Sequence, residues 1–131
     1  MRVFLWSLAV GLALTAGCGG PQEPTGPLSY SSTARRNYDA GMRELDSENC
    51  LEAVRYFEHT KRRFPYSRYA ALAELRMADC DYVQQKYVEA IAGYRQFIRF
   101  HPTHEDVPYA TFRIALSNYR QVPTEWFIVS D

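Results

Sequence analysis

The chain has 131 residues, enough for one small domain, and its 47% hydrophobic and 23% charged residues are ordinary for a globular protein. Its formal net charge is zero, so it lacks the strongly basic character that nucleic-acid-binding domains show. Aromatic residues make up 15% and include ten tyrosines, a content typical of packing between helices and also favoured at binding surfaces.

A short leader opens the chain. Arg2 gives it a positive charge, and residues 3–16 form an apolar run that is shorter than the ~20 residues a membrane-spanning helix needs. The run leads into Leu14-Thr15-Ala16-Gly17-Cys18, which resembles the lipobox of bacterial lipoproteins. This resemblance implies that residues 1–17 are a lipoprotein signal peptide and that Cys18 becomes an acylated N-terminus. A plain secretory signal with an incidental cysteine is the alternative.

The residues after the cysteine indicate where such a chain would reside. Gly19 stands where an aspartate would mark retention in the inner membrane, so the lipobox resemblance implies the periplasmic face of the outer membrane. Two or more acyl chains hold a protein stably on a membrane. Residues 18–33 are rich in Gly, Pro and Ser without an apolar period, which predicts a flexible tether.

Apolar residues at helical spacing predict an all-α domain over residues 34–121. We expect its helices at residues 34–48, 51–64, 69–84, 87–100 and 109–121. Ser32 or Thr33 is the expected N-cap of the first helix, and Ser67 is the expected N-cap of the third.

The sequence of the domain repeats at a constant spacing of 37 residues, which we call the repeat frame. Ala53 and Phe57 recur as Ala90 and Tyr94 (90 − 53 = 94 − 57 = 37), close to the ~34 residues of tetratricopeptide repeats. The frame also places a small residue in the first helix of each repeat, where a neighbouring backbone is expected to approach: Gly41, Ala78 and Ala115. We therefore expect a tetratricopeptide-repeat superhelix of about two and a half helical hairpins.

The frame stops after the fifth helix. A sixth helix is expected near Phe127 (90 + 37), but residues 122–131 predict an irregular tail. Its apolar residues 126–129 are not the polar cap that a terminal repeat needs. Either the tail folds back over the fifth helix, or the chain is a shortened version of a longer array, which we favour. Shortening predicts marginal stability and a sticky C-terminal end.

Several phrases are more specific than the general repeat pattern. They are Arg63-Phe64-Pro65-Tyr66-Ser67-Arg68-Tyr69-Ala70, Ala73-Glu74-Leu75-Arg76-Met77-Ala78 and His101-Pro102-Thr103-His104. Together with the lipobox they resemble the BamD family, the outer-membrane lipoproteins of the β-barrel assembly machine, also known as the competence lipoprotein family. The similarity extends to about Gln121 and covers only the first part of the family's longer array.

The resemblance implies a function and its partners. In the family, N-terminal repeats are implicated in receiving unfolded β-barrel substrates through an extended C-terminal segment, and C-terminal repeats contact the barrel-forming subunit. For this chain it implies a binding module for unfolded barrel substrates and partner subunits at the outer membrane. The alternative is a tetratricopeptide lipoprotein that assists secretin or pilus assembly or envelope constriction.

The first helix of each repeat is expected to line the concave side of the superhelix. Arg76 and Arg113 share a register, and spaced guanidinium groups between aromatic walls suit an extended peptide with a terminal carboxylate. The candidate groove residues are Arg35, Tyr38, Met42, Arg76, Asp79, Arg113 and Leu116. In the alternative interpretation the arginines pair with nearby acids such as Asp79 and lie solvated.

Cys50 and Cys80 remain once Cys18 carries lipid, and an oxidising periplasm favours a disulfide between them. The alternative is two buried thiols that act as small hydrophobic groups. No nucleophile–base pair or glycine-rich phosphate loop indicates an enzyme or a cofactor. His101 and His104 lack a second cluster that would complete a metal site, and an envelope enzyme using them is the remaining alternative.

Overall fold

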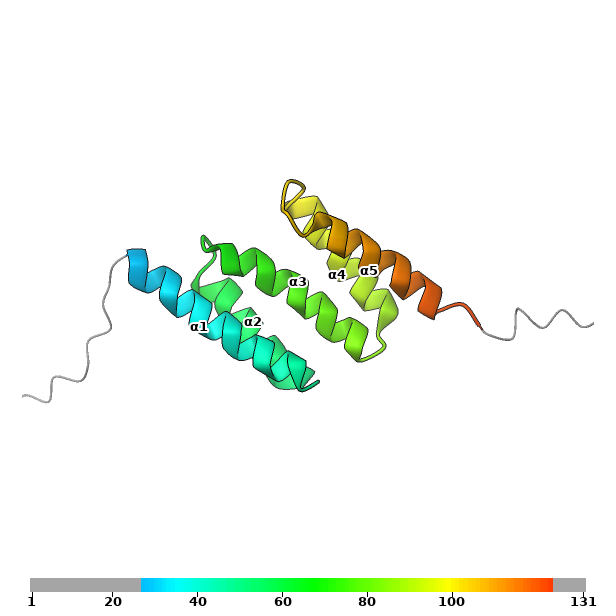
Figure 1. Cartoon of the computed structure of the whole chain (residues 1–131), viewed down its shortest axis with the longest axis horizontal. Coiled ribbons are helices and arrows are strands. Elements are labelled where there is room, and N and C mark those ends of the chain that lie inside the picture. The colour runs from blue at the N-terminus through cyan, green and yellow to red at the C-terminus, as the bar shows by residue number, and fades with distance from the viewer. Residues whose placement is uncertain (1–26, 124–131) are drawn as a thin grey trace, which may run out of the picture.

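The computed structural model describes residues 27–123. The segments with helical periodicity form a row of antiparallel helices. The helices are α1 (Pro27–Asp46), α2 (Cys50–Arg63), α3 (Arg68–Val83), α4 (Tyr87–Phe100) and α5 (Val107–Arg120). Each helix packs on the next in the chain, and α1 also reaches α3 (Figure 1). Residues 27–123 contain no β-strand, so the predicted all-α class is confirmed, with a fold of the tetratricopeptide type.

The first helix begins earlier than the sequence indicated. We expected it to start at Ala34, but α1 starts at Pro27, where the fixed φ of proline suits a first helical position. The helix gains about two turns in this way. The Tyr30 ring packs edge-on against Phe64 at 5.1 Å between centroids, which holds the added segment on the domain. The N-cap expected at Ser32 or Thr33 is therefore wrong, because both residues lie inside α1.

This correction also changes the predicted tether. The expected segment of residues 18–33 overlaps α1 from Pro27 onward, so that part is helical. Cys18, the signal peptide and the beginning of the tether lie outside the described residues, as does all but the start of the tail predicted at residues 122–131.

The remaining helix ends lie within two residues of their expected positions. Ala53 and Ala90 have no exposed surface, and neither do Phe57 and Tyr94 beside them. This burial confirms the alternation of small and large residues in the repeat frame. The cap expected at Ser67 is correct in position, but its hydroxyl makes no capping bond and instead donates to the Phe64 carbonyl oxygen at 2.9 Å.

The two tight turns inside the hairpins share one hydrogen-bond pattern. Glu48, with φ 60°, donates its N–H to the Leu45 carbonyl at 2.9 Å, and Asn49 donates to the Glu44 carbonyl at 2.8 Å. This pair of bonds is a Schellman motif, which ends a helix with one left-handed residue. The turn between α3 and α4 repeats both bonds around Gln85, with φ 61°.

The turn that follows α5 differs from the turns that follow α1 and α3. In the repeat frame Val122 and Pro123 take the places of Gln85 and Lys86 (85 + 37 = 122). The Val122 N–H still donates to the Tyr119 carbonyl at 3.1 Å. Pro123 has no N–H for the second bond, and a β-branched valine strongly disfavours a positive φ. The same tight turn therefore cannot form a third time at this point.

Two glycines allow the helices to approach closely. A Cβ added to Gly41 would lie 2.6 Å from Cε1 of Phe57, and one added to Gly93 would lie 2.8 Å from Cβ of Ala78. Gly41 therefore makes room for a ring on α2 rather than for a backbone. Ala115, expected to admit a neighbour as Ala78 does, is exposed.

Ala115 is exposed because one face of α5 has no neighbouring helix among the described residues. Phe112 is 62% exposed, whereas Leu75, its counterpart in the repeat frame (75 + 37 = 112), has no exposed surface. Leu75 belongs to the apolar cluster that α3 forms with α4 and α5. No described helix covers the equivalent face of α5, so its apolar residues remain at the surface.

Candidate functional site

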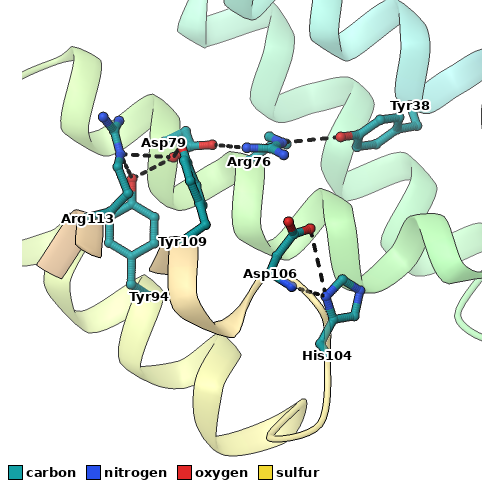
Figure 2. Close-up of polar contacts among 8 residues, drawn as sticks. All are labelled: Tyr38, Arg76, Asp79, Tyr94, His104, Asp106, Tyr109 and Arg113. Carbon is teal, nitrogen blue, oxygen red and sulfur yellow. Dashed lines mark hydrogen bonds and ion pairs between the residues drawn. The ribbon is translucent and has the colours of Figure 1, made fainter. Parts of the chain in front are cut away.

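Asp79 on α3 is the centre of a buried polar network, drawn in Figure 2. Its residue is only 4% exposed. Oδ1 accepts hydrogen bonds from the Tyr94 hydroxyl at 2.6 Å and the Tyr109 hydroxyl at 2.8 Å. Oδ2 accepts from Nη1 of Arg76 at 2.7 Å, and Nε of Arg113 lies 3.4 Å from Oδ1. Four donors thus compensate for the loss of water around this carboxylate.

Helical spacing brings these groups together. Arg76 and Asp79 stand three residues apart on α3, and Tyr109 and Arg113 stand four apart on α5, so each pair shares a helix face. Arg76 also donates from Nε to the Tyr38 hydroxyl on α1 at 3.2 Å (Figure 2). With Tyr94 from α4, the network therefore joins four of the helices.

Burial and the neighbouring carboxylate keep the tyrosines protonated. Burial raises the pKa of Tyr94, and the charge of Asp79 and the hydrogen bond to it act in the same direction. The same three causes raise the pKa of Tyr109 to about 12. Both hydroxyl groups therefore act as hydrogen-bond donors to Asp79 throughout the physiological range.

Arg113 occupies an aromatic cage. Its guanidinium carbon lies 3.7 Å from the ring centroid of Tyr82 and within 6 Å of the centroids of Tyr94 and Tyr109. Burial by itself lowers the pKa of this guanidinium. The hydrogen bond between Arg113 Nε and the Tyr94 hydroxyl, at 3.0 Å, and the charges of Tyr94, Tyr109 and Asp79 together outweigh this effect, so the pKa is raised. Figure 2 shows the two terminal nitrogens directed away from Asp79.

The structure brings four of the seven predicted groove residues together and places the other three elsewhere. Tyr38, Arg76, Asp79 and Arg113 meet in the network described above. The interpretation that the arginines pair with Asp79 is confirmed, but they are not solvated, since the Arg76 and Arg113 side chains are only 20% and 16% exposed.

The other three groove candidates lie outside the network. Arg35 pairs on the surface with Asp39, its Nε 3.4 Å from Oδ2. Met42 packs against the apolar cluster formed by α2 and α3, and Leu116 is half-buried on α5.

Two members of the network, Tyr94 and Tyr109, were absent from the predicted set. The repeat frame contained a signal for Tyr94. Met42 and Phe57 of the first hairpin become Asp79 and Tyr94 in the second (42 + 37 = 79; 57 + 37 = 94). An acid and a hydroxyl that appear together at two core positions indicate a buried hydrogen bond.

His101 and His104 contact different polar partners. Nε2 of His101 lies 3.0 Å from Oε2 of Glu74, and Nδ1 of His104 accepts the N–H of Asp106 at 3.1 Å. Within residues 27–123 no group of three or more His, Cys, Asp or Glu side chains is arranged to hold a metal ion.

The two cysteines of the domain lie together. Cys50 is 4% exposed and Cys80 is fully buried, and both are free thiols in this structure.

None of the described helices has the length and apolar character needed to cross a membrane.

Comparisons with known proteins agree on one family. The model of the family YfiO, outer membrane lipoprotein, matches residues 31–128. The outer membrane protein assembly factor BamD of Neisseria gonorrhoeae is 30% identical over 113 residues, covering 86% of this chain and 42% of that protein. The factor of the same name from Caulobacter vibrioides is 28% identical over 128 residues, covering 93% and 42%. The chain thus spans less than half the length of these curated relatives.

Proposed function

Because the chain belongs to the YfiO family of outer-membrane lipoproteins, we propose that it acts in the assembly of β-barrel proteins into the outer membrane. In this role it binds unfolded barrel substrates and partner subunits. The observation that carries the proposal is the family match over residues 31–128, which includes almost all of the five helices. Relatives named as assembly factors do not favour a role in secretin or pilus assembly or in envelope constriction.

The surface formed by α1, α3 and α5 is the proposed substrate site. The Asp79 network ties these helices together, so residues on them keep fixed positions relative to one another. Arg35 stands three residues before Tyr38, on the same face of α1, and its side chain is 67% exposed. We place an extended substrate segment along this face.

Arg113 is the proposed end of that path. Its Nε is occupied within the network, whereas its terminal nitrogens point away from Asp79 (Figure 2). A planar pair of N–H groups in this geometry binds a carboxylate with two parallel hydrogen bonds. Because the Tyr82 ring and Asp79 already hold the guanidinium in place, little side-chain entropy is lost on binding. A substrate ending in a free carboxylate fits this arrangement.

Cys18 supplies the proposed anchor. Acylation at its sulfur and its amino group would hold the chain on the periplasmic face of the outer membrane, because two or more acyl chains give stable attachment. Labelling cells with a radioactive fatty acid checks this assignment. We expect label in the natural chain and none in a Cys18→Ala variant, whereas label retained by the variant would contradict the assignment.

Site-specific photo-crosslinking tests the substrate surface. A photoreactive residue at position 35 on α1 should crosslink an unfolded β-barrel protein. The matched control is position 55 on α2, because the Arg55 side chain is similarly exposed, at 73% against 67% for Arg35. Equal crosslinking from the two positions would contradict the proposal that α1, α3 and α5 form the binding face.

Peptides with and without a terminal charge test the role of Arg113. We expect a peptide with a free C-terminal carboxylate to bind more tightly than the same peptide as an amide. Arg113→Lys should reduce this preference at least several-fold, because lysine lacks the planar fork. Arg99→Lys, on the exposed side of α4, is the control. An unchanged preference in a folded Arg113→Lys variant would exclude Arg113 as the carboxylate site.

A further inference from the structure

The folded chain brings together two cysteines that are 30 residues apart. Cys50 is the first residue of α2, and Cys80 lies in the last turn of α3. The Cys50 thiol donates to the carbonyl oxygen of Cys80 at 3.5 Å. Both side chains belong to one buried cluster that also contains Ala53, Phe57 and Ala73. The two sulfurs therefore lie in the same pocket of the core rather than on separate surfaces.

The repeat itself does not require this pair. In the frame, Tyr87 and Ser117 take the places of Cys50 and Cys80 (50 + 37 = 87; 80 + 37 = 117). The Ser117 hydroxyl donates to the Arg113 carbonyl oxygen at 2.7 Å within its own helix. Helices α4 and α5 thus pack against each other without cysteines at these positions, so the pair is a feature of the interface between α2 and α3.

We propose that Cys50 and Cys80 form an intramolecular disulfide that fastens α2 to α3. The two helices are antiparallel and are joined at one end by the turn that follows Arg63. The cysteines lie at the other end of the pair, where no chain connection holds the helices together. A bond there closes this pair at both ends and fixes the first repeat on the second.

The reaction is a thiol–disulfide exchange with a protein disulfide as the oxidant. The Cys50 thiolate attacks one sulfur of the donor, and the other donor sulfur leaves as a thiolate. The Cys80 thiolate then attacks the Cys50 sulfur of the mixed disulfide and releases the second donor thiolate. The two cysteine protons end on the released donor thiols, so the pair loses two electrons and the donor gains two. Access to such a donor in the envelope rests on the proposed function.

Because the Cys80 thiol is buried in the folded chain, the exchange takes place before the core closes. Burial raises the pKa of the Cys80 thiol, and its contact with Cys50 acts in the same direction. A protonated thiol without exposed surface is a poor nucleophile, and a donor protein has no access to it. The bond therefore forms while α2 and α3 come together, and the closed core then protects it from reduction.

Refolding in a redox buffer tests the proposal. The full chain with Cys18→Ser, so that only the pair reacts, is unfolded in urea with a reductant and refolded with glutathione and glutathione disulfide. It is then denatured in N-ethylmaleimide and weighed by mass spectrometry. We expect no maleimide, a mass two hydrogens below that of the reduced chain, and a proteolytic fragment pair linked through Cys50 and Cys80.

A matched variant and a stability measurement complete the test. Cys50→Ser in the same background should carry one maleimide or one glutathione and no internal bond. Reduction of the oxidised chain should lower its melting midpoint by roughly 5–15 °C. Two maleimides, or glutathione on both cysteines, under conditions that oxidise a reference disulfide would overturn the proposal. That result leaves the proposed function intact, because the test measures neither substrate binding nor lipid attachment.

Discussion

The two complete hairpins share one frame but stabilise their cores with different chemistry. In the first hairpin, Met42 and Phe57 pack in an apolar cluster between α1, α2 and α3. In the second, Asp79 and Tyr94 occupy the same two positions and are joined by a hydrogen bond of 2.6 Å. Two residues at equivalent positions of the repeat frame can therefore both pack against the core and still differ in polarity.

The difference has structural consequences beyond the hairpin. Met42 and Phe57 need only shape complementarity from their neighbours, whereas a buried carboxylate needs several donors. Asp79 obtains them from α3, α4 and α5, and through Arg76 it is linked to Tyr38 on α1. Within residues 27–123 no buried side-chain nitrogen or oxygen lacks a hydrogen-bond partner. The polar pair thus links α1, α3, α4 and α5 through directed hydrogen bonds, while the apolar pair contacts its neighbours through packing alone.

Removing the carboxylate is expected to have the largest effect. Asp79→Ala leaves two tyrosine hydroxyls and two guanidinium groups without their acceptor, and should lower the free energy of unfolding by about 3–5 kcal/mol. Met42→Ala, the matched change in the first hairpin, removes a half-buried side chain and should cost about 1–2 kcal/mol. Urea denaturation of both variants checks this order, and equal losses would show that the network contributes no more than packing.

Overpacking the first hairpin should have an intermediate effect. Gly41→Ala places a Cβ about where the Phe57 ring lies, since Cε1 is 2.6 Å from that position, and should cost about 1–3 kcal/mol. Adding Phe57→Leu removes the ring, so the double variant should lose less stability than the sum of the two single variants. Strict additivity in denaturation experiments would contradict the close contact between Gly41 and Phe57.

Alkaline pH should weaken the second hairpin. Tyrosine in an unfolded chain has a pKa of about 10, whereas the pKa of Tyr109 is raised to about 12 and that of Tyr94 is also raised. Their contribution is complete below pH 10. It falls as the pH rises towards 12, because the unfolded chain loses these protons before the folded chain does.

The control for this pH dependence removes one of the hydroxyls. Tyr94→Phe should make the decline of unfolding free energy between about pH 10 and 12 shallower, because one proton-linked group is lost. Phe57, the counterpart of Tyr94, has no such proton. Parallel pH profiles for the natural chain and the variant would exclude a contribution from Tyr94.

The smallest effect is expected at the surface of α1. Arg35→Ala breaks an exposed pair with Asp39 and should change stability by less than about 0.5 kcal/mol. In the frame, the counterpart of Asp39 is Arg76 (39 + 37 = 76), and Arg76→Ala should cost several times more because that side chain is largely buried. Similar losses for the two variants in urea denaturation would remove the distinction between the surface pair and the network.

The sequence by itself determined the helical frame. Apolar spacing and tight turns act between residues that are near in the chain, so the ends of α2 to α5 and the burial of Ala53 and Ala90 were predictable. The specific phrases around Pro65 and Pro102 identified the family, which the family match over residues 31–128 confirms.

Only the tertiary structure decided what depends on contacts between distant segments. The added N-terminal segment of α1 is held in place because Tyr30 reaches Phe64, and no local pattern at Pro27 reports that contact. Burial of Arg113 depends on how α5 packs on α4 and α3, since a guanidinium is equally compatible with solvent and with an aromatic cage. Helical periodicity specifies a face of a helix, and the packing of other helices determines what that face meets.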